Sequence, residues 1–219
     1  MQSTFRKIYA MLLATVALLT GNAAMAQNYY ENERTFYGGL IAGGNFTQVD
    51  GDNFAGYHKT GFNLGGIVYT KLDEHVAASM EVLYVQKGAR SKGFYTVNPG
   101  MYITDYGITL NYAEVPIMLN YFDKRKSHFG SGFSYARLGT SKEHITTVPT
   151  NTVNLNDYPF KKNDYNFVLS GNLHCWKGLF LNMRFQYSLV SIRNNTPQNY
   201  SRGQQFNNTY CLRLMYLFM

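Results

Sequence analysis

The sequence predicts an all-β fold, an eight-stranded antiparallel up-and-down transmembrane β-barrel, and three features support this prediction. Apolar and polar residues alternate over segments of about ten residues, the length that a tilted strand needs to cross a bilayer. The connections between these segments are alternately long and short. Aromatic residues make up 16% of the chain and charged residues only 15%, whereas a soluble exported domain normally carries more surface charge.

The N-terminus has the features of a secretory signal peptide. Two basic residues precede an apolar run at residues 8–19, which is too short to span a membrane as a helix, and Ala24-Met25-Ala26 is a cleavage signal. We therefore expect residues 1–26 to be removed and residues 27–219 to form one β-barrel domain. An amphipathic N-terminal helix of that domain is the less favoured interpretation.

The clearest strand covers residues 179–189. One alternating set is apolar (Leu179, Leu181, Met183, Phe185, Tyr187, Leu189) and the other is polar (Asn182, Arg184, Gln186, Ser188). Such alternation places the two sets on opposite faces of a strand. Seven other segments resemble it, although the facing of the fifth stays open, and the predicted strands cover residues 35–46, 59–70, 76–87, 106–122, 128–139, 163–175, 179–189 and 207–219.

The lengths of the connections predict an orientation. Long connections follow the odd-numbered strands, and short turns follow the second, fourth and sixth strands. Outer-membrane barrels have short periplasmic turns and longer extracellular loops. We therefore expect residues 140–162 to be extracellular, residues 123–127 to be periplasmic, and both termini to lie in the periplasm.

A soluble barrel of the lipocalin type would show the same alternation with its faces reversed. The polar faces here carry mostly Asn, Ser, Gly, Gln and Thr, whereas a water-exposed sheet usually carries many Lys and Glu. Large aromatic residues also gather near the strand ends on the apolar faces, as in the aromatic girdles of membrane proteins. Both features favour the membrane barrel.

Four charged residues fall on the polar faces of the predicted strands: Glu81, Glu114, Arg184 and Arg213. The two glutamates are on neighbouring strands, as are the two arginines, and all four lie at similar distances from the short-turn end. The interior of an eight-stranded barrel is just wide enough for side chains to fill, and buried charges require partners. We therefore expect one ion-pair network in the lumen, although four unrelated surface charges are an alternative.

Several motifs resemble the PorT-type outer-membrane β-barrel family of Bacteroidetes. They are Gly38-Gly39-Leu40, the run from Gly61 to Gly66, "Glu-x-x-Tyr-x-x-Lys-Gly" from Glu81 to Gly88, and "Tyr-x-Glu-x-Pro" from Tyr112 to Pro116. The resemblance covers most of the chain and implies an outer-membrane location. It does not imply one function, because the founding member belongs to the type IX secretion apparatus and most relatives have no assigned role.

The function expected from the sequence is a structural or surface-binding role, not an enzymatic one. The five histidines show no metal-ligand spacing, no nucleophile motif is present, and we expect no cofactor. The basic residues are scattered along the chain, which argues against nucleic-acid binding. The alternative is an accessory subunit of a type IX-like secretion system, with secretion or envelope proteins as partners. A narrow pore ranks low, and a surface protease or lipid A-modifying enzyme ranks lowest.

The predicted loops and adjoining strand ends carry ten basic and six acidic residues, which leaves +4 to face the outer leaflet. The acids are Asp50, Asp52, Asp105, Glu143, Asp157 and Asp164, and the bases are Lys59, Lys87, Arg90, Lys92, Arg137, Lys142, Lys161, Lys162, Arg193 and Arg202. Lys161 and Lys162 are the candidate contacts with lipopolysaccharide phosphates, because Lys and Arg suit phosphate oxygens. Ordinary solvated loop charges are the alternative.

Two further expectations concern association. Cys175 and Cys211 lie on opposite faces of non-adjacent predicted strands, so both thiols should be free. The barrel itself should be monomeric.

Overall fold

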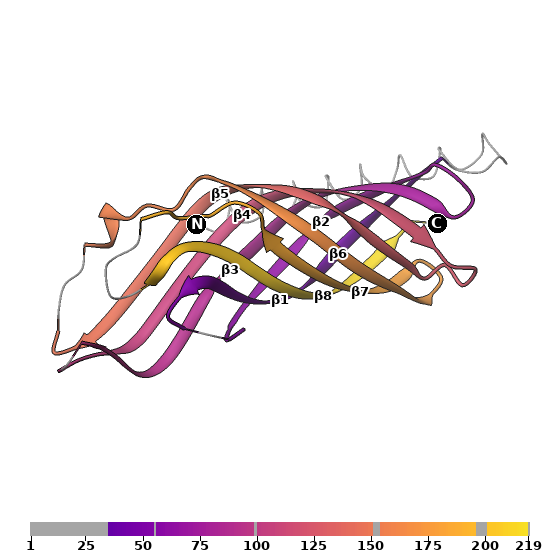
Figure 1. The fold of residues 1–219 in the computed structure, drawn as a ribbon. Helices are drawn as coiled ribbons and strands as arrows, with labels where there is room; N and C mark the ends of the chain where they lie inside the picture. The colour runs from indigo at the N-terminus through magenta and orange to yellow at the C-terminus, as the bar shows by residue number, and fades with distance from the viewer. Residues whose placement is uncertain (1–34, 55, 99, 151–153, 196–200, 219) are drawn as a thin grey trace, which may run out of the picture. The chain divides into compact units, whose positions relative to one another are not determined.

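The structure is a computed structural model that describes residues 35–54, 56–98, 100–150, 154–195 and 201–218. The expected signal peptide lies outside these residues. From Phe36 onward the chain forms one unit, a closed antiparallel barrel in which each strand pairs with its neighbours in sequence and β8 pairs with β1. Figure 1 shows the steeply tilted strands side by side. The predicted fold is therefore confirmed.

The eight strands share one turn end and one loop end. Short turns at residues 72–75, 123–127 and 177–178 define the turn end, where β1 begins and β8 ends. The strands are β1 (Phe36–Asp52), β2 (Lys59–Lys71), β3 (Val76–Asn98), β4 (Met101–Phe122), β5 (His128–Val148), β6 (Asn163–Trp176), β7 (Leu179–Ser188) and β8 (Ser201–Leu217). Among the described residues, no helix is long and apolar enough to span a membrane.

The prediction of a long loop at residues 88–105 was wrong, because β3 and β4 continue as a hairpin through most of it. Gly88 suggested a turn, but it lies inside β3 with φ of 141°, and an added Cβ would come within 2.1 Å of the Ile108 carbonyl oxygen. The glycine serves a close approach between strands rather than a chain reversal. β5 likewise continues through the first part of the loop predicted at residues 140–162.

These extensions make the barrel wall uneven at the loop end. β3, β4 and β5 have 23, 22 and 21 residues, whereas β6 and β7 have 14 and 10. In Figure 1 the three long strands project beyond the others. The loop end therefore carries a three-stranded sheet, here called the β3–β5 extension, formed by residues 86–98, 101–111 and 139–148.

Alternation sorts the side chains into an apolar outer surface and a polar interior. On β4, Ile117 and Leu119 are 61% and 60% exposed, whereas Glu114 on the opposite face of the same strand is fully buried. β5, whose facing was open, directs Phe129 and Phe133 outward and His128 and Ser134 inward. Exposed aromatics flank this apolar belt, with Tyr84, Tyr135 and Tyr165 toward the loop end and Tyr121, Trp176, Tyr216 and Phe218 toward the turn end. Such an outer surface suits lipid rather than water.

Candidate functional site

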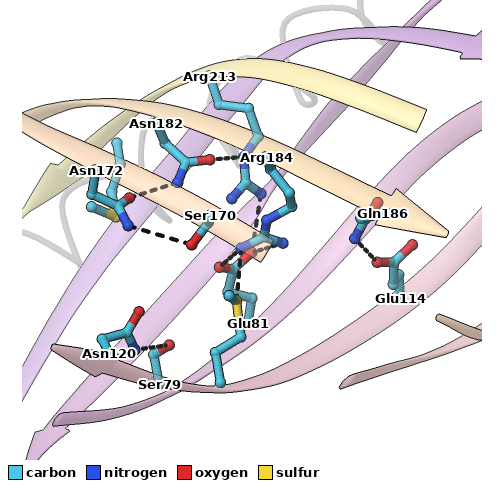
Figure 2. Close-up of polar contacts among 12 residues, drawn as sticks. Ser79, Glu81, Glu114, Asn120, Ser170, Asn172, Asn182, Arg184, Gln186 and Arg213 are labelled. Atoms are coloured by element: carbon cyan, nitrogen blue, oxygen red, sulfur yellow. Dashed lines mark hydrogen bonds and ion pairs between the residues drawn. The ribbon is translucent and has the colours of Figure 1, made fainter. Parts of the chain in front are cut away.

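The lumen contains a charged cluster centred on Glu81 of β3 (Figure 2). Arg184 reaches across from β7 and donates from both terminal nitrogens to the two Glu81 carboxylate oxygens, one of these bonds being 3.0 Å long. Arg213 of β8 donates to Glu81 Oε2 at 3.0 Å. All three side chains are at most 2% exposed. One carboxylate thus holds two guanidiniums that come from the opposite wall.

Amide side chains orient this cluster. Arg213 Nε donates to Asn182 Oδ1 at 2.7 Å, and Asn182 Nδ2 donates to Asn172 Oδ1 at 2.6 Å, so a chain of hydrogen bonds crosses β8, β7 and β6 (Figure 2). These contacts fix the plane of the Arg213 guanidinium. Such pre-organisation is needed where two like charges share one counter-ion.

The structure divides the expected network, because among the described residues Glu114 contacts no arginine side chain by hydrogen bond or ion pair. Gln186 donates to Glu114 Oε1 at 2.5 Å, and Lys87 Nζ lies 3.0 Å from Glu114 Oε2. Lys87 lies four residues beyond Leu83, the register partner of Glu114, and its long side chain reaches back to the carboxylate. Glu114 therefore belongs to a second cluster nearer the loop end.

Lys87 joins this second cluster to β6. Its ammonium lies 3.7 Å from Asp164 Oδ2 and donates to Asn166 Oδ1 at 3.1 Å, and both Lys87 and Asp164 are fully buried. Asp164 in turn accepts from Ser188 and Asn207 at 2.8 and 2.9 Å. The first cluster has two cations and one carboxylate, and the second has one cation and two carboxylates. Together they are neutral.

Lys87 and Asp164 were expected among the charges that face the outer leaflet, and this prediction was wrong because both are buried in the lumen. Lys87 is at the end of the segment predicted as β3, where it was counted with the adjoining loop. Its parity with Glu81, six residues earlier, could have shown that both face inward. Asp164 shares its parity with the inward Asn166 in the same way.

The Arg213 side chain occupies space left by Gly43 on β1, which is its register partner. A Cβ at Gly43 would lie 2.3 Å from the Leu212 carbonyl oxygen and 2.5 Å from Arg213 Cα, both backbone atoms that cannot move alone. We therefore expect Gly43→Ala to lower the free energy of unfolding by about 1–3 kcal/mol through overpacking. Urea unfolding in lipid vesicles measures this loss. Gly44→Ala is the control, because its Cβ would meet nothing nearer than 3.9 Å, and equal stability of the two variants would contradict the prediction.

Apolar layers fill the lumen on both sides of the charges. The layer nearer the turn end contains Phe180, Met215 and Tyr69, and the Tyr69 hydroxyl lies 2.9 Å from His128 Nε2. The layer at the loop end, here called the cap, is built around Tyr106 and Tyr112 with Phe54 and Ile192 from two connecting segments, and its buried members are Val49, Phe54, Ala89, Ile103, Tyr106, Ile108, Leu110, Tyr112, Ala136 and Ile192. Side chains thus occupy the described lumen at the turn end, around the two charged clusters and at the loop end.

Charged side chains tie the loop-end segments onto the cap. Arg193 is buried, donates to both Glu143 carboxylate oxygens at 3.0 and 2.5 Å, and lies 3.8 Å above the Phe160 ring. Lys161 Nζ donates to Ser191 and Asn194 at 2.9 and 2.8 Å. Arg193 and Glu143 were expected among the charges that face the outer leaflet, and this prediction was wrong because their side chains are buried against each other. Lys161 and Lys162 are both exposed, and two of the three Lys161 donors are already engaged.

The described residues contain no group of three or more His, Cys, Asp or Glu side chains able to hold a metal ion. Both cysteines are free, as predicted, with Cys175 exposed and Cys211 buried. The geometry described here stabilises a filled barrel and presents a folded cap.

No curated protein matches the chain. Similar solved structures include the attachment invasion locus protein Ail of Yersinia pestis (11% identity, 84% of this chain, 100% of that chain, TM-score 0.43) and Neisserial surface protein A (10% identity, 86% and 100%, TM-score 0.43). OprG from Pseudomonas aeruginosa is a third (11% identity, 84% and 94%, TM-score 0.38).

The sequence itself matches the model of the "Outer membrane protein beta-barrel domain" family over residues 25–194, well over half of its length. The closed eight-stranded barrel with its apolar outer belt is what such a match requires. The protein therefore belongs to the outer membrane protein β-barrel domain family and is a small barrel of the outer membrane.

Proposed function

We propose that the protein is a closed, monomeric, non-enzymatic barrel that presents its loop end outside the cell as a binding surface. The filled lumen carries this proposal, because the cap, the two charged clusters and the turn-end apolar layer leave the described interior to side chains. The long extensions of β3, β4 and β5 then enlarge the surface at the loop end, while the cap keeps the lumen closed. Rigid scaffolds that hold projecting segments commonly bind through them.

Planar-bilayer recordings test whether the barrel is closed. The purified protein should give no resolved conductance steps under conditions in which a wide porin does, because the cap and the ion pairs occupy the lumen. A steady, reproducible conductance from the folded barrel would contradict the proposal and favour the narrow pore.

The proposed orientation places the β3–β5 extension outside the cell and both termini in the periplasm. Short turns and longer loops support it. In a Cys175→Ser background, Lys142→Cys should react with a membrane-impermeant thiol reagent on intact cells, because Lys142 is exposed and Cys211 is buried. Reaction only after the outer membrane is permeabilised would show the opposite orientation.

An accessory role in a type IX-like secretion system is the second candidate, and it rests on the resemblance to the PorT-type family. Three residues of the shared motifs, Glu81, Lys87 and Glu114, lie inside the lumen and pair with other barrel side chains. These motifs therefore describe how the barrel is filled rather than which partner it has. Retention of secretion proteins after mild detergent extraction would support this candidate, and isolation of the barrel alone would favour the first.

A further inference from the structure

The outer side of the β3–β5 extension is basic. Arg90 and Lys92 of β3 and Lys142 of β5 are exposed, and the strand register places Arg90 and Lys142 near one another through the β4 residues Gly107 and Thr109. These three residues are here called the basic face. The carboxylate of Asp105 is on the same side of the extension and lies 3.1 Å from His144 Nε2.

The buried cations have carboxylate partners, whereas the cations of the basic face do not have one among the described residues. Each of the four buried cations, Lys87, Arg184, Arg193 and Arg213, has a carboxylate within 4.0 Å. In the described part of the chain, none of Arg90, Lys92 and Lys142 has such a partner. Their charges are therefore open to a ligand.

The height of the basic face above the membrane defines the kind of anion. Arg90 and Lys92 are six and eight residues beyond Tyr84 of the aromatic girdle, and Lys142 is seven residues beyond Tyr135. At ~3.3 Å per residue and a tilt near 40°, these residues lie roughly 15–20 Å above the girdle. The headgroup layer of a bilayer is only about 5–8 Å thick on each side, so phospholipid phosphates lie too low.

We propose that the basic face binds the anionic saccharide head of an outer-leaflet glycolipid, that is, a lipopolysaccharide core carrying phosphate or carboxylate groups. Such a head is anchored in the leaflet beside the barrel and extends upward along the β3–β5 extension. Arg137, which is exposed two residues beyond Tyr135, lies at the lower end of the same path and donates to Asn163 Oδ1 at 2.6 Å. This site replaces Lys161 and Lys162 as the principal contact, and it rests on the proposed orientation of the barrel.

The test compares two variants with equal charge loss. One is Arg90→Gln/Lys92→Gln/Lys142→Gln, and the control is Lys71→Gln/Lys124→Gln/Arg125→Gln at the turn end, where all three residues are also exposed. All six side chains are exposed, and a heat-induced gel-mobility shift confirms that each barrel is folded. Binding is measured by microscale thermophoresis with purified lipopolysaccharide that has a phosphorylated core, in detergent and at two salt concentrations.

We expect the triple variant of the basic face to bind lipopolysaccharide at least tenfold more weakly than the wild type, with a smaller dependence on salt. The control should remain within twofold of the wild type. Removing the core phosphates and carboxylates chemically should weaken wild-type binding to the level of the triple variant, and phosphatidylglycerol nanodiscs should not distinguish the two proteins. Equal affinity of wild type and triple variant, or unchanged binding of the stripped glycolipid, would overturn the proposal.

Two further measurements distinguish a membrane glycolipid from a soluble saccharide, and failure of the glycolipid site from failure of the proposed orientation. A soluble sulfated saccharide that bound the basic face more tightly than lipopolysaccharide would overturn the choice of a membrane glycolipid. The Lys142→Cys labelling described above is run in parallel. Labelling on intact cells together with equal lipopolysaccharide binding by wild type and triple variant would refute the glycolipid site alone, whereas labelling only after permeabilisation would refute the orientation and the site with it.

Discussion

Replacing Glu81 by glutamine is expected to lower the free energy of unfolding by about 3–5 kcal/mol, the scale for breaking a buried ion pair. Glu81 is the carboxylate that binds both Arg184 and Arg213. Its loss leaves two buried guanidiniums facing one another without their shared counter-ion. Urea unfolding in lipid vesicles, followed by tryptophan fluorescence of Trp176, measures the change.

Removing one of the two arginines should lower the free energy of unfolding by less than Glu81→Gln does. Arg184→Met leaves Glu81 paired with Arg213, so we expect a loss of about 1–3 kcal/mol, the scale for hydrogen bonds to a charged group. Adding Arg184→Met to Glu81→Gln should recover part of the glutamine variant's loss, because one of the two unpaired cations is removed. Exposed Glu74→Gln in a turn is the control, and equal losses for Glu81→Gln and Arg184→Met would show that the two cations do not share Glu81.

Replacing Lys87 by methionine should lower the free energy of unfolding by a similar amount, about 3–5 kcal/mol. Lys87 is the cation between Glu114 and Asp164, at 3.0 and 3.7 Å, and methionine fills nearly the same volume without the charge. Two buried carboxylates would then lie together unpaired. The same urea titration in vesicles measures the loss.

The matched control for this variant is Lys92→Met, five residues further along β3 but on the outer side, where we expect a change within about 0.5 kcal/mol. Glu114→Gln combined with Lys87→Met should recover part of the stability. Coupling energies from double-mutant cycles should be larger for Arg184 with Glu81 than for Arg184 with Glu114, in accordance with the hydrogen bonds. The reverse order would show that the lumen charges act as one undivided network.

The two charged clusters in the lumen balance each other electrostatically. Each cluster alone carries an excess charge, positive around Glu81 and negative around Lys87, and the two lie in one lumen. Because a low-dielectric interior strengthens interactions between charges, the opposite excesses stabilise each other. A substitution in one cluster should therefore also affect the other, although less than it affects its own hydrogen-bonded partners.

The sequence by itself determined the strand count, the inward and outward faces of most strands other than β5, and the inward position of Glu81, Glu114, Arg184 and Arg213. It could do so because side-chain alternation is a local property of an extended chain. The ends of β3, β4 and β5 were missed, since Gly88 and the polar residues that follow look like a loop to any local criterion. Only their pairing across the β3–β4 hairpin and the apolar cap beneath them show that they are strands.

The partners of the charged residues were decided by the tertiary structure alone. Parity shows that Glu114 faces inward, but the barrel's stagger and the length of the Lys87 side chain determine that it pairs with Lys87 instead of an arginine. The same holds at the loop end, where Arg193 was indistinguishable in sequence from Arg90 and Lys92 and yet is buried against Glu143. A residue's side of a strand is fixed by its neighbours in the chain, whereas its partner is fixed by residues that only the closed barrel brings within a few ångströms.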